Sequence, residues 1–189
     1  HRRLRGIKAF QAIFASTVAT SVAVAAVVFF GLVNPKIGKF GQVSFIDLSK
    51  SDSALRGVSL TSIWQNIGLT FVIVLAGLQA VPDQLMEAAQ LDGFGPVRRL
   101  FKVTLPLISP TLLFLVVVLM IFGFQAFAPM EILTNGDPAG STETLVFKIF
   151  NRQGPSLISE GSVMALGLFG LTFIVTLIQL TILNRRVHY

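Results

Sequence analysis

The chain has 189 residues, of which 53% are hydrophobic and only 13% are charged, and its mean hydropathy is +0.76. Soluble domains carry about 25% charged residues, so this composition cannot supply the polar surface of a soluble fold. The net charge is +6, but the basic residues stand at the edges of apolar segments, where they indicate membrane topology rather than nucleic-acid binding. The absence of cysteine excludes disulfides and thiolate metal sites.

Four charge-free apolar stretches are each long enough to cross a bilayer, which takes about 20 helical residues. They predict spanning helices at about 10–33, 60–81, 105–129 and 162–183. The runs are continuous and lack the alternation of barrel strands, which argues against a membrane β-barrel. We therefore expect an all-α, polytopic bundle in a lipid bilayer.

The distribution of basic residues orients these helices, because cytoplasmic loops carry an excess of Lys and Arg. Nine basic residues lie in segments 1–9, 82–102 and 185–189, against six in the remaining loops. The acids agree, with three on the first side and six on the second. Both termini and the segment 82–102 are therefore predicted to face the cytoplasm.

The cytoplasmic loop 82–106 reads PDQLMEAAQLDGFGPVRRLFKVTLP, which predicts a short helix, a turn and a second short helix. Pro82 suits a first helical position, where its missing N–H would have no helical partner anyway. Gly93 and Gly95 then end the helix, because glycine adopts backbone angles that other residues avoid. Residues 97–103 predict an amphipathic turn or two that leads into the third span.

This loop resembles the EAA motif of ABC importer permeases, in which E-A-A is followed after three residues by Gly and after nine more by I-x-L-P. The sequence has Glu87-Ala88-Ala89, then Gly93, then Val103-Thr104-Leu105-Pro106, with Val for Ile as the departure. The segments FFGLVNPKIG (29–38) and LTNGDPAGSTETLVFKIF (133–150) are similar to permeases of sugar and glycerol-3-phosphate importers.

The resemblance covers residues 1–189 as one transmembrane domain and matches the last four spans of permeases that usually have six, so we expect two further spans to precede. It implies that the loop docks on a cytoplasmic ATPase. The residues implied in this coupling are Glu87, Ala88, Ala89, Asp92, Gly93, Leu105 and Pro106. Residues 142–150 are expected to form a short interfacial helix on the outer side, where the resemblance places contact with a binding protein.

The implied partners are a second permease, two ATPase subunits and an extracytoplasmic substrate-binding protein, in a bacterial inner membrane. ATP and Mg would be bound by the ATPase, since the sequence has no GxxxxGK[ST] loop. The sequence accordingly predicts a transport subunit with no catalytic, cofactor or metal-binding residues of its own.

Polar side chains within spans are costly and usually face a cavity or another helix. The second span carries Gln65, Asn66 and Thr70, and the last two lie four apart on one helical face. The third carries Gln125 near Phe122, and an aromatic ring beside an amide suits a sugar. We predict that Asn66, Thr70, Phe122 and Gln125 line the substrate pathway. The alternative is that they bond neighbouring helices or the partner permease.

Two other classes of function stay open. An ATP-independent secondary transporter or channel usually carries an acid or histidine within the membrane, and the predicted spans have none. A membrane scaffold would bind a soluble partner through the same loop without transport. The uncharged spans also favour a neutral sugar over an anionic glycerophosphate as the cargo.

Overall fold

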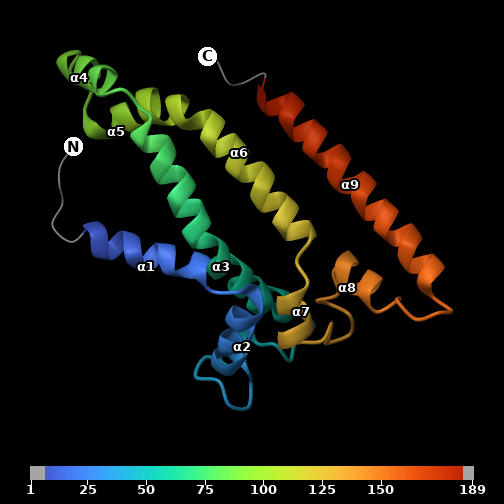
Figure 1. Ribbon diagram of the computed structural model, residues 1–189. Helices are drawn as coiled ribbons and strands as arrows, with labels where there is room; N and C mark the ends of the chain where they lie inside the picture. Colours follow the sequence, from blue (N-terminus) through green and yellow to red (C-terminus); the bar gives the residue numbers. More distant parts are fainter. Residues whose placement is uncertain (1–6, 185–189) are drawn as a thin grey trace.

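The computed structural model describes residues 7–184, and this part of the chain is helical with no strand. Three long helices dominate Figure 1: α3 (Ser51–Gln79), α6 (Leu105–Phe124) and α9 (Ile158–Asn184). The short helices are α1 (Ile7–Ala19), α2 (Val22–Val33), α4 (Asp83–Leu91), α5 (Pro96–Arg99), α7 (Ala128–Leu133) and α8 (Leu145–Phe150). The all-α prediction is confirmed. Of the basic residues used for orientation, those in 1–6 and 185–189 lie outside the described residues.

The first predicted span, 10–33, is wrong as a continuous helix. The chain breaks at Thr20 and Ser21, and the two helices on either side differ in direction by 104°. Ser21 starts α2 as its N-cap, because its side-chain oxygen accepts a hydrogen bond from the backbone N–H of Val24 at 3.3 Å. No charged residue stands at the break, so a charge-free run does not reveal it, although Ser16, Thr17, Thr20 and Ser21 cluster there.

Three helical stretches are long and apolar enough to cross a membrane, namely Ser51–Gln79, Pro96–Phe124 and Ile158–Thr181, and a fourth crossing results if the bent α1–α2 pair counts as one. The third span differs from its predicted range of 105–129 at its end, because α6 stops at Phe124 and a new short helix, α7, begins at Ala128. The second span begins earlier than predicted, at Ser51.

The base of α6 is continuous with α5 through a π-helical turn, Leu100–Thr104, so the second helix of the predicted loop is not separate from the span. The wide turn comes directly before Pro106, whose ring would crowd a regular helical turn. Pro110 leaves the carbonyl of Pro106 without a backbone donor, and the Ser109 hydroxyl donates to it at 2.8 Å.

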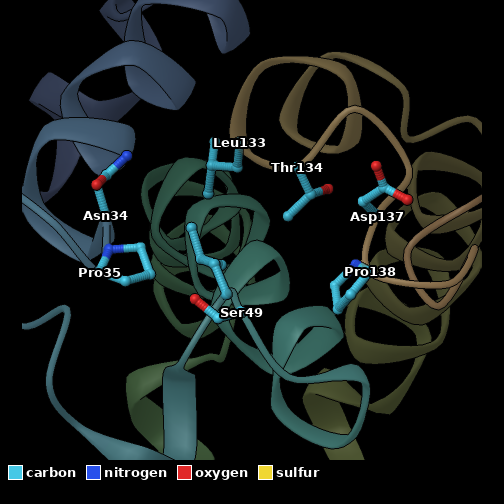
Figure 2. Close-up of a pocket in the computed structure, with 8 residues that line it drawn as sticks. Asn34, Pro35, Ser49, Leu133, Thr134, Asp137 and Pro138 are labelled. Atoms are coloured by element: carbon cyan, nitrogen blue, oxygen red, sulfur yellow. The ribbon is translucent and has the colours of Figure 1, made fainter.

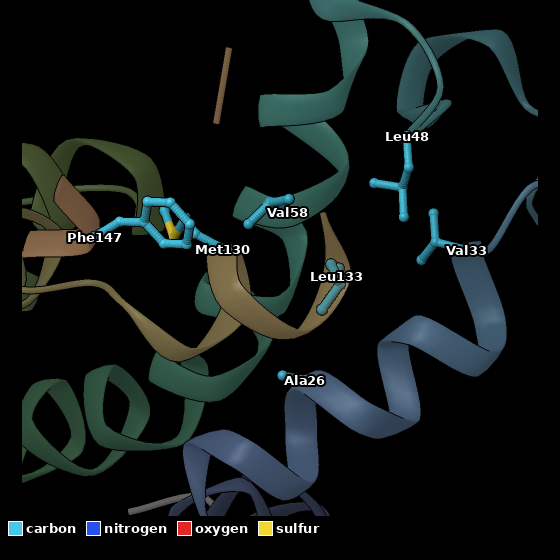
Figure 3. Close-up of a cluster of buried hydrophobic side chains, with 7 residues drawn as sticks. All are labelled: Ala26, Val33, Leu48, Val58, Met130, Leu133 and Phe147. Carbon is cyan, nitrogen blue, oxygen red and sulfur yellow. The ribbon is translucent and has the colours of Figure 1, made fainter. Parts of the chain in front are cut away.

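A cluster of buried apolar side chains holds together the end of the molecule farthest from α4 (Figure 3). Its side chains come from α2, α3, α7 and α8 and from the loop before α3. Its members are Ala26, Val33, Leu48, Val58, Met130, Leu133 and Phe147. By contrast, the described side chains of α9 are mostly exposed and apolar. This helix packs on α6 and α8 and makes at most marginal contact with the other described elements. A bilayer accepts such a surface, whereas water does not.

Candidate functional site

A cavity of about 940 Å³ lies between α3 and the junction of α6 with α7. Its walls come from the middle of α3, the last turn of α6, the start of α7 and both sides of the α1–α2 break. All four residues predicted for the substrate pathway line it: Asn66, Thr70, Phe122 and Gln125. The structure therefore brings these residues together, and their contact with a cargo stays a prediction.

The polar part of the wall follows from helical spacing along α3. Ser62, Asn66 and Thr70 are four residues apart, so they share one face. The side-chain amide of Asn66 donates to the carbonyl of Ser62 at 2.8 Å, which fixes the rotamer of this residue. From the other side, Gln125 stands at the C-cap of α6, where the helix ends and its side chain is exposed.

The cavity wall formed by residues 7–184 contains amides, hydroxyls and apolar groups but no formally charged side chain. Amides and hydroxyls both donate and accept hydrogen bonds, so they can bind solute hydroxyls in several orientations. An anionic group placed here would meet only neutral donors and the start of α7 on this wall.

The sequence interpretation did not select two parts of this wall. Gln65 lines the cavity, and its amide nitrogen donates to the carbonyls of Thr17 at 3.2 Å and Thr20 at 2.5 Å, across the helix break. Residues 126–130 also line it, although 126–129 were assigned to the third span. The signal for them was Pro129, which suits the first turn of a new helix better than the interior of an old one.

The predicted coupling helix is α4, at the end of the molecule that also holds the C-terminal end of α9 (Figure 1). It closes with a Schellman motif: Phe94 N–H donates to the carbonyl of Ala89 at 3.0 Å, and Gly93 N–H to that of Gln90 at 3.1 Å. Gly93 has a φ of +74°, a conformation that glycine adopts without strain.

The residues predicted for coupling fall into two groups. Glu87, Ala88, Asp92 and Gly93 are exposed on α4 and its cap, whereas Ala89 is buried against the rest of the molecule. Leu105 and Pro106 lie instead at the first turn of α6, beyond the π-helical turn.

Two contacts attach α4 and its cap to the base of α6. The Thr104 hydroxyl donates to the sulfur of Met86 on α4 at 3.7 Å. The guanidinium carbon of Arg98 lies 4.3 Å from the ring centre of Phe94, within the range of a cation–π contact. These contacts join α4 to the helical stretch that carries Phe122 at its other end.

The opposite end of the molecule carries a second, smaller pocket of about 290 Å³ (Figure 2). It is lined by Asn34, Pro35, Leu48, Ser49, Leu133, Thr134, Asp137 and Pro138. The short helix expected within 142–150 is present beside it as α8. Two of the acids at this end are already paired, Glu143 with Lys148 at 3.0 Å and Glu160 with Arg152 at 3.4 Å.

Comparison with known proteins accounts for this arrangement. The family described as "Binding-protein-dependent transport system inner membrane component" matches residues 2–189. The chain belongs to this family. Its members are membrane components of transport systems, which agrees with the apolar helices and the exposed apolar surface described above.

Curated members of the family are similar over almost the whole chain. The sn-glycerol-3-phosphate transport system permease protein UgpA of Yersinia pseudotuberculosis serotype I (strain IP32953) is 36% identical, over 98% of this chain and 66% of the relative. The protein of that name from Salmonella typhimurium (strain LT2) is 33% identical with the same coverage. The chain spans about two thirds of the length of these relatives.

Solved structures show the same fold. A bacterial ABC transporter involved in the import of the acidic polysaccharide alginate matches with a TM-score of 0.75, 22% identity and coverage of 96% of this chain and 67% of that one. A bacterial alginate ABC transporter in complex with an alginate pentasaccharide-bound periplasmic protein matches with a TM-score of 0.72 and 21% identity. This match covers 94% of this chain and 64% of that one. The helices of this chain thus follow the fold of ABC importer permeases.

Proposed function

We propose that this chain is a pore-forming subunit of an ATP-driven importer, in which the cavity between α3 and the α6–α7 junction is part of the cargo pathway. The observation that carries the proposal is the placement of the four predicted pathway residues around one cavity, at the middle of α3 and the end of α6 that lies away from α4. Cargo contact and ATPase contact would then act on different parts of the same two helices.

In this proposal α4 docks on a partner ATPase at the cytoplasmic face. Its exposed acids and Ala88 support this role, since they leave an acidic helix face with a small apolar residue free for a partner. Arg98, Arg99 and Lys102 support the cytoplasmic placement of this end, as does the positive-inside rule. Both termini would lie on the same side, and Glu87 and Asp92 would face the ATPase.

The opposite end would meet the other partners. A substrate-binding protein would dock over the loops around the pocket of Figure 2 and α8, and a second permease subunit would complete the pathway. One relative by fold is in complex with an alginate pentasaccharide-bound periplasmic protein, which supports a partner of that kind.

For the cargo, two solute classes have separate support. The curated relatives are named for sn-glycerol-3-phosphate, which makes this phosphate ester the first candidate. The uncharged cavity wall favours a neutral sugar or polyol, because hydroxyls need no counter-charge. If a phosphate is carried, its charge would be met by neutral donors or a helix N-terminus in this chain, by the second permease subunit, or by the binding protein.

The direct test is ATP hydrolysis by the assembly reconstituted with its ATPase and binding protein, measured with sn-glycerol-3-phosphate, glycerophosphodiesters and neutral sugars. Gly93→Pro is the disrupting variant, because proline cannot adopt a φ of +74°. Gly95→Ala is the matched control, since Gly95 has an ordinary φ of −63° and open space around it.

We expect one solute to stimulate hydrolysis in the unaltered chain and with Gly95→Ala, and the stimulation to be lost with Gly93→Pro. Stimulation that survives Gly93→Pro would show that α4 is not the coupling element. Failure of any ATPase to bind the chain would favour an ATP-independent transporter or a scaffold.

A further inference from the structure

The cavity wall includes a stretch that belongs to no helix, the α6–α7 junction (residues 125–127), where the backbone leaves one helix and enters the next. All three residues of the junction line the cavity. No backbone N–H of the described residues donates to the carbonyl of Ala126. A carbonyl at this depth needs a donor from elsewhere, because an unpaired backbone group away from water is costly.

Thr144 supplies that donor from 18 residues further along the chain. Its hydroxyl donates to the Ala126 carbonyl at 2.9 Å. The same oxygen accepts a hydrogen bond from the Phe147 N–H at 3.3 Å, which makes Thr144 the N-cap of α8. One hydroxyl therefore ties the start of α8 to the cavity wall.

Two aromatic contacts lie beside this hydrogen bond. The ring centre of Phe127 lies 4.7 Å from that of Phe150 and 6.2 Å from that of Phe147, both on α8. Phe147 is buried in the apolar cluster of Figure 3, and α8 also packs on α9. The junction is therefore held by a packed part of the molecule as well as by the two helices that it joins.

The position of the junction sets the spacing across the cavity. Gln125 and Phe127 line it from the junction, and Asn66 and Thr70 line it from α3. A cargo that bonds both sides must match this spacing, because hydrogen bonds weaken steeply away from their preferred distance and angle. A wall that is fixed before cargo arrives also lowers the ordering cost of binding.

We propose that Thr144 is a positioning residue, which determines the affinity and the selectivity for cargo by holding the α6–α7 junction in place. This inference rests on the proposed transport function. Thr144 does not itself line the cavity, so it acts through Ala126 and its two neighbours. Without its hydroxyl the junction gains freedom, and solutes of other shapes then fit nearly as well as the preferred one.

The test is equilibrium binding of labelled sn-glycerol-3-phosphate and labelled sucrose to the assembly of permease and ATPase subunits in nanodiscs. The binding protein is left out, because its own affinity would hide that of the cavity. Thr144→Val keeps the shape of the side chain and removes both hydrogen bonds. Thr144→Ser keeps the hydroxyl. Thr144→Asp keeps an acceptor for the N-cap of α8 but has no donor for Ala126 at neutral pH.

Thr172→Val on α9 is the matched control. The Thr172 hydroxyl donates to carbonyls of its own helix, those of Leu168 and Phe169, and its side chain does not line the cavity. This substitution therefore makes the same chemical change in a spanning helix without touching the junction.

We expect Thr144→Val to raise the dissociation constant of the better-bound solute about tenfold, as for the loss of one hydrogen bond, and to move the ratio of the two dissociation constants towards one. Thr144→Ser should restore both values, and Thr172→Val should change neither. Thr144→Asp should resemble Thr144→Val, and it takes its place if Thr144→Val does not assemble.

Unchanged dissociation constants in Thr144→Val would overturn the inference. Recovery in Thr144→Asp would do so too, because the effect would then come from the cap of α8 alone. Equal losses in Thr144→Val and Thr172→Val would also overturn it, since they would show a general loss of structure. Absence of solute binding to the unaltered assembly would instead count against the cargo cavity of the proposed function.

Discussion

Gly77 of α3 faces Thr111 of α6 so closely that a Cβ built on the glycine would lie 2.9 Å from the Thr111 methyl carbon. The two helices thus nearly touch at the end beside α4. They separate towards the other end, where the cavity lies. Small residues at a helix crossing are typical of membrane bundles, because packing rather than the hydrophobic effect holds such helices together.

Gly77→Ala should therefore lower the free energy of unfolding by about 1–3 kcal/mol, the usual cost of an overpacked contact. Thr111 is β-branched and has little freedom to move aside. The measurement is a thermal or denaturant unfolding curve in detergent. Gly167→Ala on α9 is the control, because its added methyl meets nothing within 4 Å.

A double substitution sharpens this prediction. Thr111→Ala removes two of the three atoms nearest to the built Cβ, so it should restore part of the stability lost in Gly77→Ala. If the two substitutions are additive, the close crossing of α3 and α6 does not exist in the folded protein.

The cap of α4 gives a second prediction. Gly93→Ala meets no atom within 4 Å but must hold a φ of +74°, which costs a residue with a side chain about 1 kcal/mol. Asn tolerates this conformation better. Cargo-stimulated ATP hydrolysis should therefore fall in the order glycine, asparagine, alanine, proline at this position. An equal rate for alanine and asparagine would contradict a role for the cap geometry.

A third prediction concerns pH and the loop before α3. The backbone N–H of Ser49 donates to the Asp47 carboxylate at 2.9 Å and, with help from Lys50, lowers the pKa of that carboxyl below its ordinary value of 3.8. A depressed pKa contributes stability that is complete above the unfolded-state pKa and disappears as pH falls through the folded-state pKa. The window therefore lies below about pH 5.

Asp47→Asn keeps an oxygen acceptor for Ser49 but does not titrate. Unfolding curves collected between about pH 6 and pH 2 should show the unaltered chain losing stability relative to Asp47→Asn only in the acid part of this range. Parallel pH profiles for the two proteins would show that the Asp47 carboxylate has the same pKa in the folded and unfolded states.

Much of the helical content could be predicted because a charge-free apolar run of about 20 residues is typical of a membrane-spanning helix. The cavity could be predicted in part, since Asn66 and Thr70 share a helical face and Gln125 stands beside aromatic rings. Those inferences depend only on local spacing and on the cost of polar groups in lipid.

The break between α1 and α2 could not be predicted in the same way. Four hydroxyl residues, Ser16, Thr17, Thr20 and Ser21, stand at the break, but uncharged hydroxyl residues also occur in continuous spanning helices. The hydrogen bonds that cross the break come from Gln65, 45 residues further along the chain than Thr20, so no local pattern contains them. The π-helical turn before Pro106 was missed for a related reason: proline signals a helix start, but a wide turn can also accommodate it.

The central claim is that cargo crosses the membrane through the cavity between α3 and the α6–α7 junction under control of a partner ATPase. The most direct measurement is uptake of labelled solute into vesicles that hold the reconstituted assembly, for the unaltered chain, Asn66→Leu, Gln125→Leu and the control Gln79→Leu. We expect uptake to require ATP, to persist in Gln79→Leu, and to need about tenfold more solute for half-saturation in each cavity variant, as for the loss of one or two hydrogen bonds. Uptake that proceeds without ATP, or that is the same in all four proteins, would contradict the account.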